Sequence, residues 1–242
     1  MIEIQLFNHK KLIRDYVEVS LTKYLGFNVS DMFDVADNCY IFGGSIRDII
    51  SNRVSEINDI DILTVSKSCM ALGDLLHKNG YILNNDSERH ENIGELYNLK
   101  DVIFEPHTYI KGDKTVQLIR PYGNVVVSKH ILNTLLTNVD LTTSGLYYDG
   151  MYVNESVFGA FSDVVNNKFR ILDDSIMLNP NRIDSRTNKL LKKGWVHEKN
   201  PHTLYPIYPR EIYDEDYYEN KDYLTFINRQ LNLEKILREY NF

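Results

Sequence analysis

Apolar positions recur along the chain at two spacings, and these spacings separate predicted helices from predicted strands. In residues 9–25 apolar side chains return every three or four positions, which is the period of one buried helix face. The same period predicts further helices over residues 45–52, 70–79, 130–136, 179–193 and 222–240.

Short apolar or alternating runs between these helices predict strands. Two single strands are expected, over residues 39–44 and 59–65, and a third over residues 168–172. Two hairpins are also predicted, one over residues 102–121 and one over residues 142–153, because a tight glycine-containing turn interrupts each run. Helices and strands alternate, so we expect an α/β (α+β) fold with a small mixed sheet flanked by helices.

The predicted strands all lie within residues 1–175, which we expect to form one head (palm) domain. Residues 176–242 are predicted to form a helical neck and a C-terminal extension, and their acidic, tyrosine-rich stretch is typical of a linker or surface segment. A length of 242 residues with 43% hydrophobic residues allows one large domain or one domain with a small appendage.

Composition excludes several classes of protein. No apolar run approaches the roughly 20 residues that cross a bilayer, and the first residues lack the apolar block of a secretory signal. Cys39 and Cys69 lie in segments predicted to be buried, so we expect a cytoplasmic protein without disulfides. The net charge of −7 argues mildly against a general nucleic-acid binder but allows a local basic patch.

Two acidic residues alternate on the predicted strand over residues 59–65. Asp59 and Asp61 therefore point to one face, with their Cβ atoms roughly 7 Å apart, while Ile60 and Ile62 point to the other. That separation lets both carboxylates bind the same divalent ions. An isolated acid-x-acid pair is nevertheless common on solvated strands, so the pair needs a second signal.

The second signal is the turn Gly43-Gly44-Ser45, which joins a predicted buried strand to a helix. Free N–H groups at such a helix start favour phosphate, and glycine lets the backbone approach an anion closely. The spacing places this turn beside the acid pair. Phosphoryl transfer needs that adjacency, because a triphosphate must lie next to bound Mg²⁺. The residues therefore predict a metal-dependent nucleotidyltransferase with an NTP as substrate and Mg²⁺ as cofactor.

The stretch YIFGGSIRDIISNRVSEINDIDILT resembles the head of the polymerase-β-like nucleotidyltransferase superfamily. The resemblance is to the branch of class II CCA-adding enzymes and bacterial poly(A) polymerases, whose signature is Gly-Gly-x-x-Arg-Asp followed by Asp-x-Asp. In this chain the signature falls on Gly43, Gly44, Arg47, Asp48, Asp59 and Asp61.

A looser resemblance continues to about residue 195. It places Asp140 where the family contacts the sugar of the incoming nucleotide, and Arg182 where a neck helix reads the base. Asp59 and Asp61 are thus the implied metal ligands and catalytic residues. The implied nucleotide-binding residues are Gly43, Gly44, Ser45, Arg47, Asp48, Asp140 and Arg182.

The chain also departs from the family pattern. Asn179 occupies the place of the base-reading aspartate, Gln117 that of the third acidic position, and Asn138 and Val139 those of the paired arginines. The large helical body of a CCA-adding enzyme has no counterpart, which suggests a miniature enzyme of a phage or other mobile element. Trp195 is expected to be a core anchor.

Three functions stay open at this stage. The first is a template-independent transferase that adds NMP to an RNA 3′ end, with tRNA as the expected acceptor; the resemblance favours it. The second is a transferase that modifies a protein or small molecule, which the acidic net charge favours. The third is an inactive nucleotide- or RNA-binding relative. A basic face on the helix over residues 179–193 can guide either an RNA end or a triphosphate.

Overall fold

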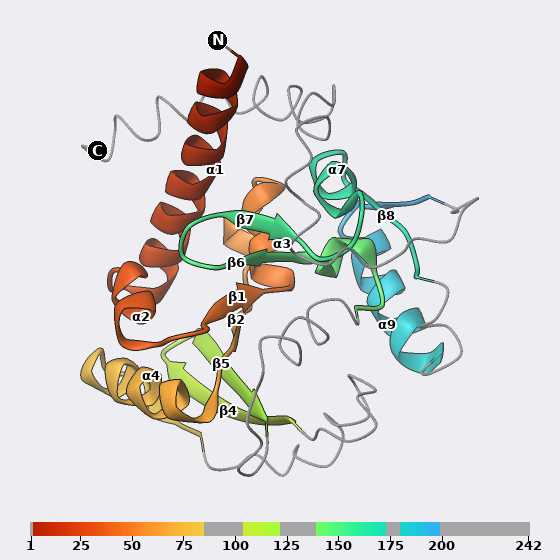
Figure 1. The fold of residues 1–242 in the computed structure, drawn as a ribbon. Coiled ribbons are helices and arrows are strands. Elements are labelled where there is room, and N and C mark those ends of the chain that lie inside the picture. The colour runs from red at the N-terminus through yellow and green to blue at the C-terminus, as the bar shows by residue number, and fades with distance from the viewer. Residues whose placement is uncertain (1, 85–103, 122–138, 173–179, 199–242) are drawn as a thin grey trace.

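A computed structural model describes residues 2–84, 104–121, 139–172 and 180–198 (Figure 1). Its α-helices are α1 (Ile2–Leu25), α2 (Ser30–Val35), α3 (Gly44–Ile50), α4 (Ser66–Lys78), α7 (Ala160–Val165) and α9 (Pro180–Lys192). Two 3₁₀ turns are η1 (Val54–Glu56) and η3 (Thr142–Ser144). The strands are β1 (Tyr40–Phe42), β2 (Asp59–Leu63), β3 (Ile82–Leu83), β4 (Phe104–Lys111), β5 (Lys114–Pro121), β6 (Leu146–Tyr148), β7 (Val153–Glu155), β8 (Lys168–Phe169) and β9 (Val196–His197).

Seven of these strands form one mixed sheet, in the order β3-β4-β5-β2-β1-β6-β7. Strands β2 and β5 pair in parallel, whereas the other neighbouring pairs in this sheet are antiparallel. Strands β8 and β9 form a separate parallel pair. The mixed sheet flanked by helices confirms the predicted fold class.

Helices cover the face of the sheet opposite to the acid pair. Helix α3 packs on β1, β2 and β6, α4 packs on β5, and α1 lies against α3. Ile60 and Ile62 of β2 have no solvent exposure and join the core with the apolar side chains of these helices. The alternation predicted from sequence is therefore confirmed, because Asp59 and Asp61 are left partly exposed on the other face.

Several predicted elements differ from the structure at their ends. Helix α1 begins well before residue 9 and spans 24 residues. None of the described helices has both the length and the apolar character needed to cross a membrane. Both hairpins form, but the second begins at Leu146, because Thr142 enters a 3₁₀ turn and donates its N–H to the Arg170 carbonyl at 3.0 Å. The predicted helices over residues 130–136 and 222–240 lie outside the described residues, as do Asn138 and Asn179.

A buried ionic network ties η3, α7 and the segment after β8 together. The Asp163 carboxylate accepts hydrogen bonds from Arg170 Nε at 2.8 Å and from the Thr142 hydroxyl at 2.5 Å. The same hydroxyl accepts the Arg170 backbone N–H at 3.0 Å. Burial raises the pKa of Asp163, and the bonds from Arg170 and Thr142 partly oppose this rise. These contacts hold Thr142 and its neighbours beside the end of the sheet that carries the candidate site.

Candidate active site

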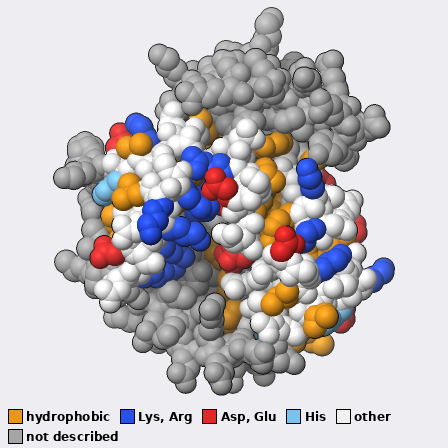
Figure 2. All heavy atoms as spheres, turned by 180° about the vertical axis from the view of Figure 1, so that it is seen from behind, with side chains coloured by type: hydrophobic (Ala, Val, Ile, Leu, Met, Phe, Trp, Pro, Cys, Tyr) orange, Lys and Arg blue, Asp and Glu red, His pale blue; other side chains and the backbone are white. Residues whose placement is uncertain are grey.

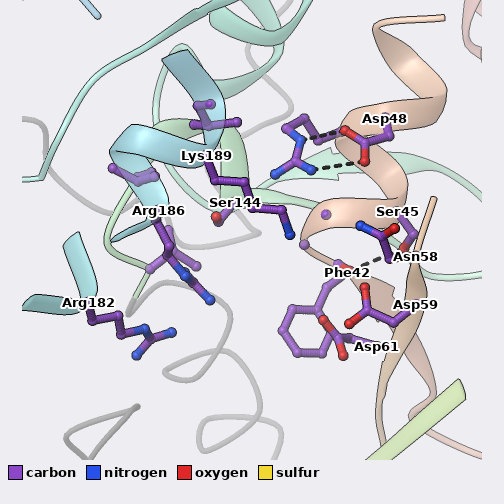
Figure 3. A pocket seen from close by; sticks show the side chains of 16 residues that line it. Phe42, Ser45, Asp48, Asn58, Asp59, Asp61, Ser144, Arg182, Arg186 and Lys189 are labelled. Atoms are coloured by element: carbon purple, nitrogen blue, oxygen red, sulfur yellow. Dashed lines mark hydrogen bonds and ion pairs between the residues drawn. The ribbon is translucent and has the colours of Figure 1, made fainter. Parts of the chain in front are cut away.

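A cleft lies between the turn after β1, the first residues of β2 and helix α9 (Figure 3). All but one of the site residues predicted from sequence line this cleft, although they come from separate parts of the chain. The exception is Asp140, which lies just behind the cleft wall and contacts α9. The lining also includes Arg186 and Lys189, which belong to the basic helix face predicted from sequence. Six further lining residues were not singled out by the sequence: Phe42, Asn58, Val139, Leu141, Ser144 and Leu190.

The two carboxylates of β2 form the acidic wall of the cleft. Asp61 pairs with Phe42 of β1 on one side and with Gln117 of β5 on the other, so Gln117 does lie beside the acid pair. Burial raises the pKa of Asp61 to about 7; the negative charge of Asp59 adds to this rise and the positive charge of Arg186 opposes it. A negative charge on Asp61 is thus costly in the cleft.

The glycine turn places bare backbone next to these acids. Gly43 has φ 74° and ψ −132°, a backbone conformation that only glycine adopts easily. A Cβ atom on Gly43 would lie 3.7 Å from Asp61 Oδ2, so the turn and the acid pair adjoin directly. Gly44 begins helix α3, and the Arg47 guanidinium lies over it, with Nη2 3.4 Å from the position of a Cβ atom.

Arg47 and Asp48 form an ion pair with each other inside the cleft. Arg47 Nε and Nη2 donate to the two Asp48 oxygens at 2.7 and 3.0 Å, and the Asp48 side chain is only 4% exposed. The Lys193 ammonium also approaches Asp48, at 3.7 Å. Because its oxygens are engaged by cations, Asp48 braces the glycine turn and is not available as a metal ligand in this arrangement.

A cluster of ionic and aromatic contacts fixes the C-terminal end of α9 to the rest of the fold. Arg53 donates to the Lys193 carbonyl at 2.6 Å and to Asn167 Oδ1 at 3.0 Å, while Lys193 pairs with Glu56 at 2.9 Å. Trp195 is 2% exposed, and its ring centroid lies 5.3 Å from the Arg53 guanidinium carbon. Trp195 is therefore a core anchor, as predicted.

Helix α9 forms the basic wall opposite the acid pair. Arg182, Arg186 and Lys189 are spaced at i, i+4 and i+7, so all three share one helix face, and Figure 3 shows them directed into the cleft. Arg186 pairs with Asp140 at 2.5 Å, and Arg182 approaches the same carboxylate at 3.4 Å. The helical period was the available signal for this shared face, whereas nothing local in the sequence marked Asn58 or Ser144.

The molecular surface carries a basic patch on the side of α9. In Figure 2 Lys and Arg side chains gather on the side of the molecule where α9 lies, and acidic side chains lie next to them. The patch contrasts with the net charge of −7 for the whole chain. A local basic surface, which the sequence allowed, is thus present beside the cleft.

We expect Asp61→Asn to stabilise the metal-free protein at high pH. The pKa of Asp61 is higher in the folded state than in the unfolded chain, so the wild type loses stability as the pH rises from about 4 to 7. Partial exposure limits the loss to about 1–2 kcal/mol, or a few degrees in melting temperature. Thermal unfolding in EDTA at pH 5 and pH 8 measures the difference, which should be larger at pH 8.

The matched control is Asp113→Asn, at the exposed turn between β4 and β5. That variant should follow the wild type at both pH values, since Asp113 lies in solvent. If Asp61→Asn melted below the wild type at pH 8, the charge on Asp61 would not be the cost that its burial implies.

Comparison with known proteins gives a fold but no family assignment. The chain matches no known family profile and no curated protein sequence. It is similar to the structure of a CCA-adding enzyme in complex with ATP, with 17% identity over 94% of this chain and 55% of the other, at a TM-score of 0.54. A Thermotoga maritima CCA-adding enzyme complexed with tRNA aligns at 16% identity over 94% and 54% of the two chains, with a TM-score of 0.51.

These similarities define the class of fold. The described residues have the nucleotidyltransferase fold seen in CCA-adding enzymes, as the resemblance of the glycine turn and acid pair implied. The chain spans just over half the length of the two proteins compared, at 55% and 54%.

Proposed function

We propose that this chain is a metal-dependent nucleotidyltransferase that transfers NMP from an NTP to an acceptor hydroxyl and releases pyrophosphate. The observation that carries the proposal is the cleft itself, where the acid pair of β2, the glycine turn and the basic face of α9 converge. In this reaction the acceptor oxygen forms a bond to the α-phosphorus, and the bond from that phosphorus to the bridging oxygen of the pyrophosphate breaks.

Asp59 and Asp61 are the residues that would hold Mg²⁺. Magnesium commonly uses one or two protein carboxylates and completes its octahedron with water and substrate phosphates, so two acids suffice. The described residues contain no cluster of three or more His, Cys, Asp and Glu side chains suited to a metal. When bound, the ion supplies charge stabilisation and lowers the pKa of the attacking hydroxyl.

The other residues of the cleft would bind and orient the substrate. The turn Gly43-Gly44-Ser45 would receive phosphate oxygens with its backbone, since glycine leaves room for close approach. The Arg47–Asp48 pair would keep this turn in place. For Asp140 and Arg182 the resemblance implies contacts to the sugar and the base. Their 3.4 Å ion pair would hold Arg182 at the cleft, with Asp140 behind the cleft wall.

An RNA 3′ end, with tRNA first among candidates, is the acceptor that we propose. The basic patch beside the cleft supports this choice, because an RNA end brings phosphates that cations attract. One of the similar structures is a CCA-adding enzyme complexed with tRNA, which adds support by analogy of fold. The net charge of −7 favours the rival acceptor, a protein or small molecule.

Incubation with each α-labelled NTP, Mg²⁺ and deproteinised tRNA tests both parts of the proposal. We expect label to enter RNA, and the NTP that supplies it identifies the nucleotide. Parallel reactions contain total protein or no acceptor. Label in protein or in a small product would reject RNA as the acceptor and keep the transferase. If no label moved in any reaction, the chain would be a binding relative instead.

A further inference from the structure

Two cations of α9 face the acid pair from positions to which the family resemblance gives no role. Arg186 and Lys189 both line the cleft, and Figure 3 shows Lys189 extending from α9 into the space between that helix and the glycine turn. Lys189 is exposed and makes no ion pair with any described residue. Arg186 is held in place by Asp140 at 2.5 Å, and its side chain is still 40% exposed.

With both carboxylates of β2 ionised, the charges of the cleft and of Asp140 behind it balance. Arg182, Arg186 and Lys189 supply three positive charges, and Asp140, Asp59 and Asp61 supply three negative ones. Arg186 and Asp61 line the same cleft, one from α9 and the other from β2. A divalent ion on the acid pair would cancel two negative charges, which would leave the α9 wall with an excess of two positive charges.

We propose that Arg186 and Lys189 bind the pyrophosphate portion of the incoming NTP, so that α9 recognises phosphate. The proposal rests on the proposed function and names the part of the substrate that α9 contacts. The Arg186 guanidinium is fixed by a carboxylate, so its remaining N–H groups point in a defined direction toward one phosphate. The Lys189 ammonium is flexible and adjusts its position to bind the other phosphate. Both groups donate only, which suits phosphate oxygens better than a base edge with mixed donors and acceptors.

Calorimetric titration with inorganic pyrophosphate in the presence of Mg²⁺ measures this site directly. We expect Lys189→Ala and Arg186→Ala each to weaken pyrophosphate binding by roughly 10-fold or more, as for the loss of a charged hydrogen-bond donor. A nucleoside monophosphate should bind wild type and variants alike. Omission of Mg²⁺ should weaken pyrophosphate binding to the wild type.

Lys192→Ala is the matched control, because Lys192 is an exposed cation of the same helix that does not line the cleft. It should retain wild-type affinity. If Lys192→Ala lost as much affinity for pyrophosphate as Lys189→Ala, the loss would reflect the total positive charge of the helix. The assignment of Lys189 to the pyrophosphate site would then be wrong. Lys189→Ala is the decisive variant, since its exposed side chain supports no other group, whereas Arg186→Ala also unpairs Asp140.

Two further results separate this assignment from the proposed function. If Lys189→Ala weakened the binding of tRNA but not of pyrophosphate, the α9 cations would serve the acceptor and the proposal would fall. Pyrophosphate binding that depends on Lys189, in a protein that transfers no label, would uphold the phosphate site while the transferase function failed.

Discussion

Asp59→Asn and Asp61→Asn are each expected to reduce nucleotidyl transfer by roughly 10²–10³-fold or more. Loss of a charged group that acts on the reacting phosphate has an effect of this size in other enzymes. In this cleft Asp59 and Asp61 are the lining carboxylates not engaged by an ion pair with a described residue, whereas Asp48 is bound by Arg47. Transfer of α-labelled nucleotide under single-turnover conditions measures the loss.

The two variants should keep the native fold. Neither carboxylate makes a hydrogen bond or ion pair with another described residue, and both lie on the face of β2 opposite to the one on which α3 packs. Circular dichroism therefore should not change, and Asp61→Asn should melt above the wild type in EDTA. Activity retained within a few-fold of the wild type in either variant would remove the acid pair from the mechanism.

Asp163→Ala is expected to have the largest effect on stability, about 3–5 kcal/mol. The change leaves the Arg170 guanidinium, only 17% exposed, without the carboxylate that it contacts at 2.8 Å, and it also removes the acceptor of the Thr142 hydroxyl. Breaking a buried ion pair by deleting one partner costs this much because the remaining charge stays buried. The melting temperature should fall by roughly 10 °C in a thermal unfolding experiment.

The control for this prediction is an ion pair at the surface. Lys168 and Glu198 lie 3.2 Å apart with side chains 42% and 47% exposed, so Glu198→Ala should change stability by less than about 1 kcal/mol. Similar melting temperatures for Asp163→Ala and Glu198→Ala would show that the buried network is not a main support of the fold. Asp163→Asn keeps an acceptor for Thr142 and should fall between the two.

The parts of the site that local sequence determines were predictable. Alternation within β2 was enough to place Asp59 and Asp61 on one face, since a strand turns its side chains by a fixed period. The glycine turn was recognisable because a glycine pair stands between a short apolar run and a helix start, and in the structure Gly43 adopts a positive φ that favours glycine. The parallel pairing of β2 with β5 also placed Gln117 beside Asp61, as the resemblance had implied.

The basic wall could be predicted only in part, because it depends on contacts between distant segments. The helical period predicted that Arg186 and Lys189 share a face, but not that this face meets the acid pair. That orientation is set by the contacts of Arg53 and Glu56 with Lys193. Arg53 and Lys193 are 140 residues apart in the chain. Such pairing leaves no periodic signal in the sequence. The placement of Asp140 behind α9 depends on the same docking.

The burial of Trp195 gives the protein an intrinsic optical reporter. It is the chain's one tryptophan, and its indole lies 5.9 Å from the Arg47 guanidinium carbon and 5.3 Å from that of Arg53. All tryptophan fluorescence therefore originates at the junction between α9 and the segment that carries the glycine turn. Emission at short wavelength reports a docked helix, and a red shift reports its release into water. Because Arg47 also lines the cleft, a ligand that displaces its guanidinium should change the intensity without a dye or label.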